Sequence, residues 1–474
     1  MEVTRAARHL VVAGLLIGWA PAGVLGQSAT PVDSYFEFLA ARHLEGEGDN
    51  AGALAALQRA AAADPTSAEV RAEIAAFQLR RNLRAEAEKA AREALTIDAN
   101  NTEANRVLGQ ILAAVADRDN GNSDQILAVV REAIVHLEKA AAAATGVADP
   151  NTNYRLGSLY LRSGQADKAT QALARVLSQN PGSRQARLTM AQAQAQNKDL
   201  KGAILTLEEI VDDEPGVAGA LAQYQEQAGL LSEAVESYTR ALAVQPTNRQ
   251  IKARRVLALY DLKDFPRAVT AAAEAQRQHP DDPQFPRLQA SALYAGGDAP
   301  KAITVLESAT TTFPKDNTSK LALVDMYQNV KRFPDAERVL RQMLAVDPTN
   351  ADALNFLGYM LANNNDRLDE AIRLVNQALQ KDPGNGAYLD SLGWAHFKKG
   401  NLAEAEKYLT DAITKLPKNA EVLDHVGDLY AKRSRWQQAV DAWSLALEGE
   451  GSGTNKEEIQ KKIENAKGKM QNAK

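Results

Sequence analysis

One alanine recurs at a nearly constant interval through most of this 474-residue chain. Seven of the eleven intervals between successive copies are 34 residues, and the other four are 46, 36, 31 and 35. A period of this length is typical of a chain built from one repeated helical unit, in which each copy packs only against its neighbours. The twelve copies are Ala53, Ala87, Ala133, Ala169, Ala203, Ala234, Ala268, Ala302, Ala336, Ala371, Ala405 and Ala439.

Proline supplies a second marker in the same register. In nine of the twelve units a proline stands twelve residues after the alanine, and Ala99, Thr145 and Gly451 take its place in the others. Because proline ends a helix, each copy predicts the end of the second helix of a unit. These prolines are Pro65, Pro181, Pro215, Pro246, Pro280, Pro314, Pro348, Pro383 and Pro417.

Several units also carry a large aliphatic residue followed by glycine in the first helix. The best copies are LGSLY at 156–160, LGY at 357–359, LGW at 392–394 and VGDLY at 426–430. Together with the alanine and the proline, they resemble the tetratricopeptide repeat, a 34-residue helix–turn–helix, over about residues 34–450. The resemblance implies an all-α fold, a right-handed α-solenoid of about twelve helix–turn–helix repeats with a polar capping helix at the C-terminus.

The glycine and the alanine suit two antiparallel helices that cross closely, because only small residues let the two backbones approach. We therefore expect Ala405 to lie opposite Gly393 at the crossing in repeat eleven. Larger neighbours such as Leu357 and Leu392 form apolar stripes that a single unit cannot bury, so neighbouring units must stack. The first helices of successive repeats should then line a concave groove.

The first 26 residues differ from the rest of the chain. Arg5 and Arg8 precede an apolar run from Leu10 to Ala20, about half the length that a bilayer-spanning helix needs, and small residues follow it. This pattern predicts a signal peptide cleaved after Gly26, and hence a periplasmic or secreted protein. A lipid anchor at the cleavage point is excluded because the chain has no cysteine. The alternative is an uncleaved N-terminal anchor.

Two irregular segments organise the mature chain. We expect residues 27–149 to hold repeats one to three, with an insertion near 115–128, and residues 150–450 to hold repeats four to twelve. Residues 451–474 then form a linker followed by a C-terminal capping helix and tail, because the exposed end of a stack of repeats needs a polar face.

The charge balance argues against two classes of partner. The chain has 55 basic and 60 acidic side chains, a net charge of −5, and both signs are mixed along its length. It therefore lacks the basic patch that nucleic acid or an anionic membrane surface would attract. No segment long enough to span a membrane is expected after cleavage of the signal peptide.

No pattern of residues predicts catalysis, a metal site or a cofactor. The absence of cysteine removes thiolate nucleophiles and thiolate metal ligands. Residues 117–124 alternate acidic and amide side chains, but Asn122 and Ala128 stand where a calcium-binding EF-hand loop needs glycine and glutamate. The histidines lie in different units, and His396 and His425 are expected to have packing or surface roles. We do not expect an enzyme.

Three functional classes stay open. The favoured one is a protein-binding scaffold or adaptor of the bacterial cell envelope, which the resemblance and the lack of catalytic residues support. A glycan-binding or polysaccharide-export component of the periplasm is the alternative, and exposed aromatic side chains in the groove would favour it. An enzyme built on the solenoid itself is the weakest, because no mature segment longer than about 30 residues lies outside the repeats.

The last three repeats carry the candidate binding residues. Some members of the family clamp a peptide carboxylate with lysine and asparagine, an arrangement that only Arg106 and Gln110 approach here. Equivalent positions of repeats ten to twelve are instead acidic, amide or aromatic, and should form two parallel rows in the groove. The candidate residues for binding a protein or peptide are Asn355, Tyr359, Asp390, Trp394, Phe397, Asp424 and Asp428.

Such a groove predicts a peptide ligand that carries basic groups beside apolar ones. The competing interpretation is that Trp394 and Phe397 pack between neighbouring helices, and that the carboxylates are simply solvated.

Overall fold

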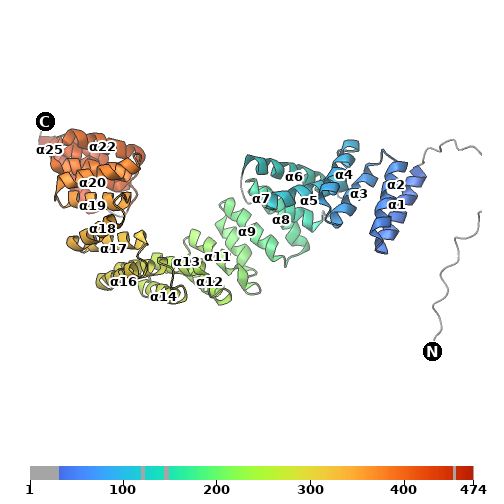
Figure 1. The fold of residues 1–474 in the computed structure, drawn as a ribbon, viewed down its shortest axis with the longest axis horizontal. Coiled ribbons are helices and arrows are strands. Elements are labelled where there is room, and N and C mark those ends of the chain that lie inside the picture. The colour runs from blue at the N-terminus through green and yellow to red at the C-terminus, as the bar shows by residue number, and fades with distance from the viewer. Residues whose placement is uncertain (1–30, 119–122, 144–148, 452–454, 473–474) are drawn as a thin grey trace, which may run out of the picture. The chain divides into compact units, whose positions relative to one another are not determined.

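The computed structural model describes residues 31–118, 123–143, 149–451 and 455–472. In these residues the regular secondary structure is helical, apart from a single bridge between Asn419 and Glu450. The helices follow one another as pairs, as Figure 1 shows. The expected signal peptide at 1–26 and residues 119–122 of the expected insertion lie outside the described residues.

The chain forms two compact units, the first ending at Ala228 and the second beginning at Gly229. The helices of the first unit are α1 (Pro31–Gly46), α2 (Asn50–Ala63), α3 (Ala68–Arg80), α4 (Arg84–Ile97), α5 (Thr102–Arg118), α6 (Asp124–Ala143), α7 (Pro150–Arg162), α8 (Ala166–Gln179), α9 (Arg184–Gln196), α10 (Leu200–Glu208), the 3₁₀ helix η1 (Pro215–Val217) and α11 (Ala218–Gln227).

The helices of the second unit complete twelve pairs and add one terminal helix. They are α12 (Leu231–Val244), α13 (Arg249–Asp261), α14 (Phe265–Gln278), α15 (Gln284–Ala295), α16 (Ala299–Thr312), α17 (Asn317–Asn329), α18 (Phe333–Val346), α19 (Ala351–Asn363), α20 (Leu368–Lys381), α21 (Gly386–Lys399), α22 (Leu402–Lys415), α23 (Ala420–Lys432), α24 (Trp436–Glu448) and α25 (Lys456–Asn472).

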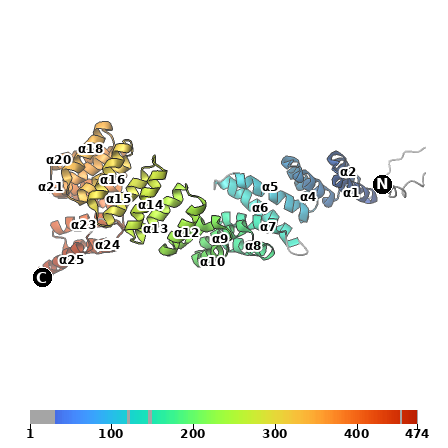
Figure 2. The same cartoon turned by 90° about the horizontal axis from the view of Figure 1, so that it is seen from below.

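Odd-numbered helices up to α23 are the first helices of the repeats, called helices A, and even-numbered ones are the second helices, called helices B. Helix A packs on helix B of its own repeat, and helix B packs on the next helix A: α5 contacts α6 and α6 contacts α7, and α19 contacts α20 and α20 contacts α21. Some successive helices A also contact each other, as α19 and α21 do. Within each of the two compact units, successive pairs lie side by side in Figure 1 and in the turned view of Figure 2. The expected all-α fold of stacked helix pairs is confirmed.

All twelve recurring alanines lie in helices B and are fully buried, each with 0% of its surface exposed. The glycines of helices A mark the close contacts between the two helices of a pair. A Cβ added to Gly393 would lie 2.7 Å from Cγ of Leu409, and one added to Gly157 would lie 2.6 Å from Cγ of Leu173. The nearest atoms to Gly393 belong to Leu409, four residues further along helix B than the predicted Ala405, while at the equivalent Gly358 the repeat alanine Ala371 is itself close, with its carbonyl oxygen 3.0 Å from an added Cβ.

The proline marker also has a structural counterpart. In eight of the nine repeats that carry this proline, helix B ends two residues before it. For example, α14 ends at Gln278, two residues before Pro280. The exception is α10, which ends at Glu208, whereas Pro215 begins the 3₁₀ helix η1. Proline fixes φ and has no N–H group, so the helix cannot continue through it.

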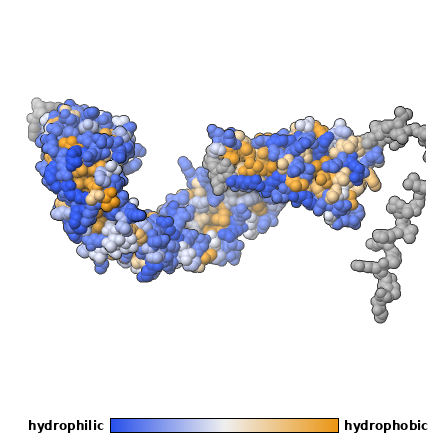
Figure 3. Space-filling model, in the orientation of Figure 1, coloured by the Kyte–Doolittle hydropathy of each residue, from blue (hydrophilic) through white to orange (hydrophobic). Residues whose placement is uncertain are grey.

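The C-terminal helix α25 closes the end of the second unit. Its buried residues Ile459, Ile463 and Ala466 form one apolar cluster with Trp443 of α24. Its other face is polar, as on most of the surface visible in Figure 3, where apolar residues occupy limited stretches. Within the described ranges, no helix is both long enough and apolar enough to cross a bilayer.

Candidate functional site

A pocket of about 600 Å³ lies in the second unit, where the helices A of repeats nine to twelve meet. It is bounded by α17, α19, α21 and the start of α23. The residues that line it are Asp325, Gln328, Asn329, Asn355, Phe356, Tyr359, Ala387, Asp390, Ser391, Asn419, Ala420, Glu421 and Gly451. Three of the seven residues expected from the sequence, Asn355, Tyr359 and Asp390, are among them.

Asn355 is the least satisfied polar residue of the pocket. Only 9% of its surface is exposed, and its Oδ1 atom is buried without a hydrogen-bond partner in the described structure. A buried amide oxygen without a partner costs free energy, because it has lost its water and gained nothing in return. Asn355 is also one of the residues that line the pocket.

Tyr359 and Glu421 link repeats ten and twelve across the pocket. The phenol of Tyr359 donates a hydrogen bond of 2.5 Å to Oε1 of Glu421. Burial, and then the negative charge of Glu421, raise the pKa of Tyr359 well above its ordinary value, so the phenol stays protonated and keeps donating. Glu421 keeps free lone pairs that face the pocket, because a carboxylate accepts several hydrogen bonds.

Asp390 lies at the back of the pocket and is paired with a histidine. Nδ1 of His425 is 2.9 Å from Oδ1 and 3.0 Å from Oδ2 of Asp390. Burial alone would lower the pKa of His425, but the charge and hydrogen bond of Asp390 outweigh it and raise this pKa above its ordinary value. Asp390 and His425 therefore form a buried ion pair that fixes repeat eleven against repeat twelve.

Trp394 belongs to the core, the partly buried Phe397 packs against that core, and neither residue lines the pocket. The Trp394 side chain is 7% exposed and stacks between His425, with centroids 4.0 Å apart, and Phe397, 5.0 Å away. Both residues pack with the apolar core of repeats nine to eleven. The structure places them as the competing packing interpretation describes, because stacking of repeat twelve on repeat eleven covers the Trp394 ring.

Asp424 and Asp428 form ion pairs with a lysine of the same chain. Nζ of Lys462, on α25, lies 2.8 Å from Oδ1 of each of these residues and 5.8 Å from the ring centre of Trp443. Burial, opposed by Lys462, still raises the pKa of Asp428, whereas the two carboxylates overcome burial and raise the pKa of Lys462. Both pKa values rise, but the rise disfavours the charged form of Asp428 and favours the charged form of Lys462. The reason is that one ammonium group is shared by two partly buried carboxylates. Neither aspartate lines the pocket.

Asp325 lines the pocket although the sequence analysis does not select it. It occupies, in repeat nine, the position that Tyr359 and Trp394 hold in the next two repeats. Asp325 is an exposed residue, yet the surrounding protein removes enough water from its carboxylate to raise the pKa of Asp325 to about 6. Aligning helix A of repeat nine with the helices A of repeats ten and eleven is enough to identify Asp325 as a groove-facing residue.

The pocket is negatively charged. Three of its lining residues are carboxylic acids, and none of the described lining residues is lysine or arginine. In the part of the chain that the structure describes, no group of acidic or histidine side chains has the arrangement to hold a metal ion.

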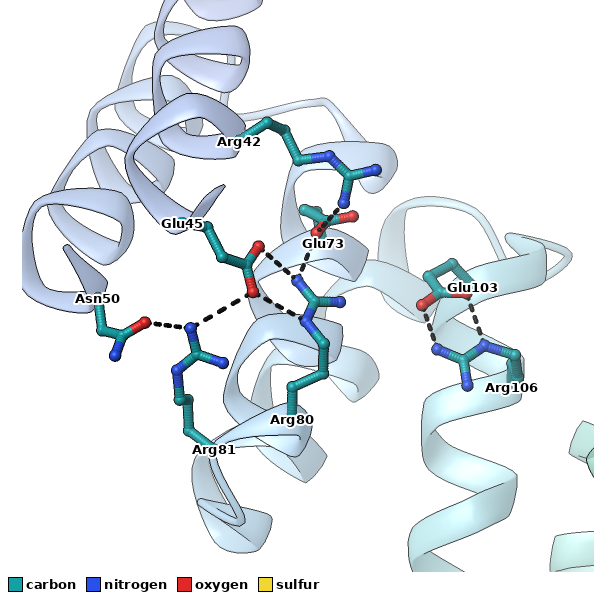
Figure 4. A network of polar contacts seen from close by, with 8 residues as sticks. All are labelled: Arg42, Glu45, Asn50, Glu73, Arg80, Arg81, Glu103 and Arg106. Atoms are coloured by element: carbon teal, nitrogen blue, oxygen red, sulfur yellow. Dashed lines mark hydrogen bonds and ion pairs between the residues drawn. The ribbon is translucent and has the colours of Figure 1, made fainter. Parts of the chain in front are cut away.

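Repeats one to three differ from this site, because their charges neutralise one another (Figure 4). Arg80 donates to Glu45 and Glu73, with N–O distances of 2.9 to 3.0 Å, and Arg42 donates to Glu73. Arg106, which comes nearest to a carboxylate clamp in the sequence, is held by Glu103 of the same helix at 2.7 Å. This network leaves Arg106 engaged within the chain.

Comparison with known proteins identifies the repeat. Two family models described as tetratricopeptide repeat match residues 130–183, 161–224 and 362–432, and residues 220–283, 253–317 and 320–386. Together these matches run from residue 130 to residue 432 with a gap only at 318–319, which is more than half of the chain. The chain belongs to the tetratricopeptide repeat family.

Individual tetratricopeptide repeat proteins are only distantly similar. The TPR repeat-containing protein PA4667 of Pseudomonas aeruginosa is 36% identical over 73 residues, 15% of this chain and 12% of that protein. Yeast Tom70 shares 12% identity at a TM-score of 0.46, covering 92% of this chain and 96% of its own. A Thermus thermophilus TPR protein shares 20% identity at a TM-score of 0.34, covering 39% and 98%. None of these similarities transfers a ligand.

Proposed function

We propose that this protein is a non-catalytic scaffold of the bacterial cell envelope that binds partner polypeptides through the pocket between α17, α19, α21 and α23. The observation that carries the proposal is the buried Oδ1 atom of Asn355, which has no partner in the described structure and borders a pocket of about 600 Å³. A bound chain would supply the missing donor from a backbone N–H or a side chain.

Support for a polypeptide rather than a glycan comes from the aromatic residues. Fully exposed aromatic faces in the groove would favour a glycan, but Trp394 is buried between Phe397 and His425, and the aromatic residues that line the pocket, Phe356 and Tyr359, are only partly exposed. The carboxylates of the pocket match the basic and amide groups of a polypeptide. Tetratricopeptide repeats are protein-interaction modules, which also favours a polypeptide over a glycan as the ligand.

Crosslinking inside cells tests the binding site. A photoreactive residue at Gln328, which lines the pocket, should yield a discrete adduct with another polypeptide. The matched control is the same substitution at Asp411, an exposed position on helix B of repeat eleven. Adducts that form equally at both positions, or at neither, would contradict the proposed pocket.

The cellular location is the second part of the proposal. It rests on Arg5, Arg8 and the apolar run from Leu10 to Ala20, which have the order of a signal peptide. N-terminal sequencing of the protein purified from fractionated cells should find Gln27 as the first residue, in the periplasmic fraction or the medium. An intact N-terminus in the cytoplasmic fraction would contradict export.

A further inference from the structure

We propose that the pocket selects an arginine side chain of the bound polypeptide and holds its guanidinium group. This inference rests on the proposed function, because it names the side chain that the peptide site recognises. It follows from the hydrogen-bonding capacity of the pocket, from its charge and from the shape of its walls.

The charged groups of the pocket, Asp325, Asp390 and Glu421, all accept hydrogen bonds. Asp325 has no hydrogen bond or ion pair with a described residue, and Oδ1 of Asn355 has no partner. The hydroxyl groups present are already used as donors within the chain: Ser391 donates to the carbonyl of Ala387 at 3.0 Å, and Tyr359 donates to Glu421. A cation that brings several donors therefore matches the charged lining groups, while the amides of Gln328 and Asn329 can either donate or accept.

An anion is a poor fit, although a helix begins at the pocket. The first N–H groups of α23 are already bonded: Asn419 Oδ1 accepts from Glu421 and Val422, each at 3.0 Å, and the carbonyl of Glu450 accepts from Ala420. The start of this helix therefore has no donors to spare for an anion. The carboxylate of Glu421 in the first turn adds repulsion.

Arginine fits better than lysine. The guanidinium group has five N–H donors and no acceptor, always carries its charge, and is planar, so it can bond to carboxylate and amide oxygens while stacking on an aromatic ring. Phe356 and Tyr359 supply ring surface in the wall, beside Asn355. The ammonium group of lysine is compact and strongly hydrated, has three donors, and gains less from flat walls.

Binding of arginine should depend on pH through Asp325. The other titratable groups at this pocket are Tyr359 on α19, Asp390 on α21 and Glu421 on α23, and His425 is bonded to Asp390. Because burial raises the pKa of Asp325 to about 6, this residue loses part of its charge as the pH falls below 7. The affinity for arginine should therefore fall on acidification.

The test uses three small probes on the full-length protein: N-acetyl-arginine amide, N-acetyl-lysine amide and N-acetyl-citrulline amide. Citrulline keeps the shape of arginine without the charge. Ligand-observed NMR titrations should give an affinity for the arginine probe about tenfold higher than for the citrulline probe, because charge-assisted hydrogen bonds are the stronger ones. Equal affinities for arginine and citrulline would overturn the proposal, and equal affinities for arginine and lysine would overturn the choice of arginine.

Variants locate the binding site. Asp325→Asn and Asn355→Leu should each weaken the arginine probe about fivefold or more, through loss of a charged or a buried acceptor. Asp325→Asn should also reduce the change in affinity between pH 7.5 and pH 5. The matched control is Asp411→Asn, which removes an exposed carboxylate from α22, away from the pocket, and should leave the affinity unchanged. Arginine binding that is unaffected by Asp325→Asn would refute the site.

Crosslinking separates failure of this inference from failure of the proposed function. If Gln328 still yields a specific polypeptide adduct while arginine and citrulline bind equally, the groove binds polypeptides without arginine selectivity, and only the inference falls. If the arginine preference holds, Asp325→Asn should also reduce the yield of the adduct at Gln328, whereas Asp411→Asn should not. An undiminished adduct in Asp325→Asn would count against arginine as the recognised side chain.

Discussion

Asp390 of repeat eleven and His425 of repeat twelve form a buried ion pair, with Nδ1 of the histidine 2.9 Å from Oδ1 of the aspartate. Less than a tenth of either side chain is exposed. The imidazole also stacks on Trp394, so this pair joins the wall of the pocket to the core beneath it. One contact therefore couples the stability of the last repeats to the protonation of a histidine.

The pair predicts a pH-dependent stability. The pKa of His425 is raised in the folded protein, so its stabilising contribution is complete below the ordinary value of 6.5 and is lost as the pH rises through the raised folded-state pKa. Burial lowers the pKa of His136 and His396, which act in the opposite direction. The informative quantity is therefore the difference between the wild type and Asp390→Asn.

Urea unfolding of both proteins between pH 6 and pH 9 measures this difference. The stability lost through Asp390→Asn should be largest at pH 6 and should shrink as the pH rises. An NMR titration of His425 provides a direct check and should give a pKa above 6.5. A cost of the substitution that is the same at every pH would rule out the ion pair.

Trp394 is predicted to stabilise the folded protein and not to bind a ligand. Trp394→Ala should lower the free energy of unfolding by about 3–5 kcal/mol, the usual cost of removing a large buried aromatic side chain. Trp436→Ala, at a partly exposed tryptophan of α24, should cost less and serves as the control. If Trp394→Ala instead unfolds like the wild type and loses its crosslinked partner, this tryptophan is a binding residue after all.

Lys462 is predicted to stabilise the end of the chain. Lys462→Met keeps an unbranched side chain beside Trp443 but leaves Asp424 and Asp428 without their cation. The pair is partly buried, so the loss should lie between the about 0–1 kcal/mol of exposed ion pairs and the about 3–5 kcal/mol of broken buried ones.

The exposed neighbour Lys461 supplies the control for that experiment, since Lys461→Met should change stability little. The defect of Lys462→Met should become smaller at acidic pH, because the pKa of Asp428 is already raised and its protonation removes the repulsion with Asp424. A defect that grows on acidification would contradict this account.

The repeat architecture could be predicted from the sequence because it depends on residues that each act within a single repeat. The alanines of helix B and the prolines after it act within a single unit, so their spacing alone indicates where each unit lies. Contacts between units are harder to predict. The exposure of Trp394 depends on how His425 of the next repeat packs, and nothing in the register of repeat eleven specifies that contact.

The candidate site was predictable in part for the same reason. Asn355, Tyr359 and Asp390 share the groove-facing register and do line the pocket. Asp424 and Asp428 share that register too, but Lys462 covers them, and α25 lies beyond the last repeat, where no periodicity predicts its position. Whether any of these residues binds a ligand stays a prediction.

The contact between Gly393 and Leu409 gives the last prediction, which tests the packing common to the repeats. A Cβ at position 393 would lie 2.7 Å from Cγ and 3.0 Å from the backbone nitrogen of Leu409. The side chain can rotate away, but the backbone contact yields only if α21 and α22 separate. Gly393→Ala should therefore lower the free energy of unfolding by about 1–3 kcal/mol through overpacking.

Gly468 is the matched control, because it also lies in a helix and a Cβ added there meets nothing within 4 Å. Gly468→Ala should raise stability by about 0.5–1 kcal/mol, since alanine loses less backbone entropy than glycine when a helix forms. The double variant Gly393→Ala with Leu409→Ala should be less stable than Gly393→Ala alone, because removing the fully buried Leu409 side chain costs about 2–5 kcal/mol, more than relief of the clash returns. Chemical denaturation of the four proteins measures these differences, and equal effects at positions 393 and 468 would show that helices A and B do not approach as closely as the glycine requires.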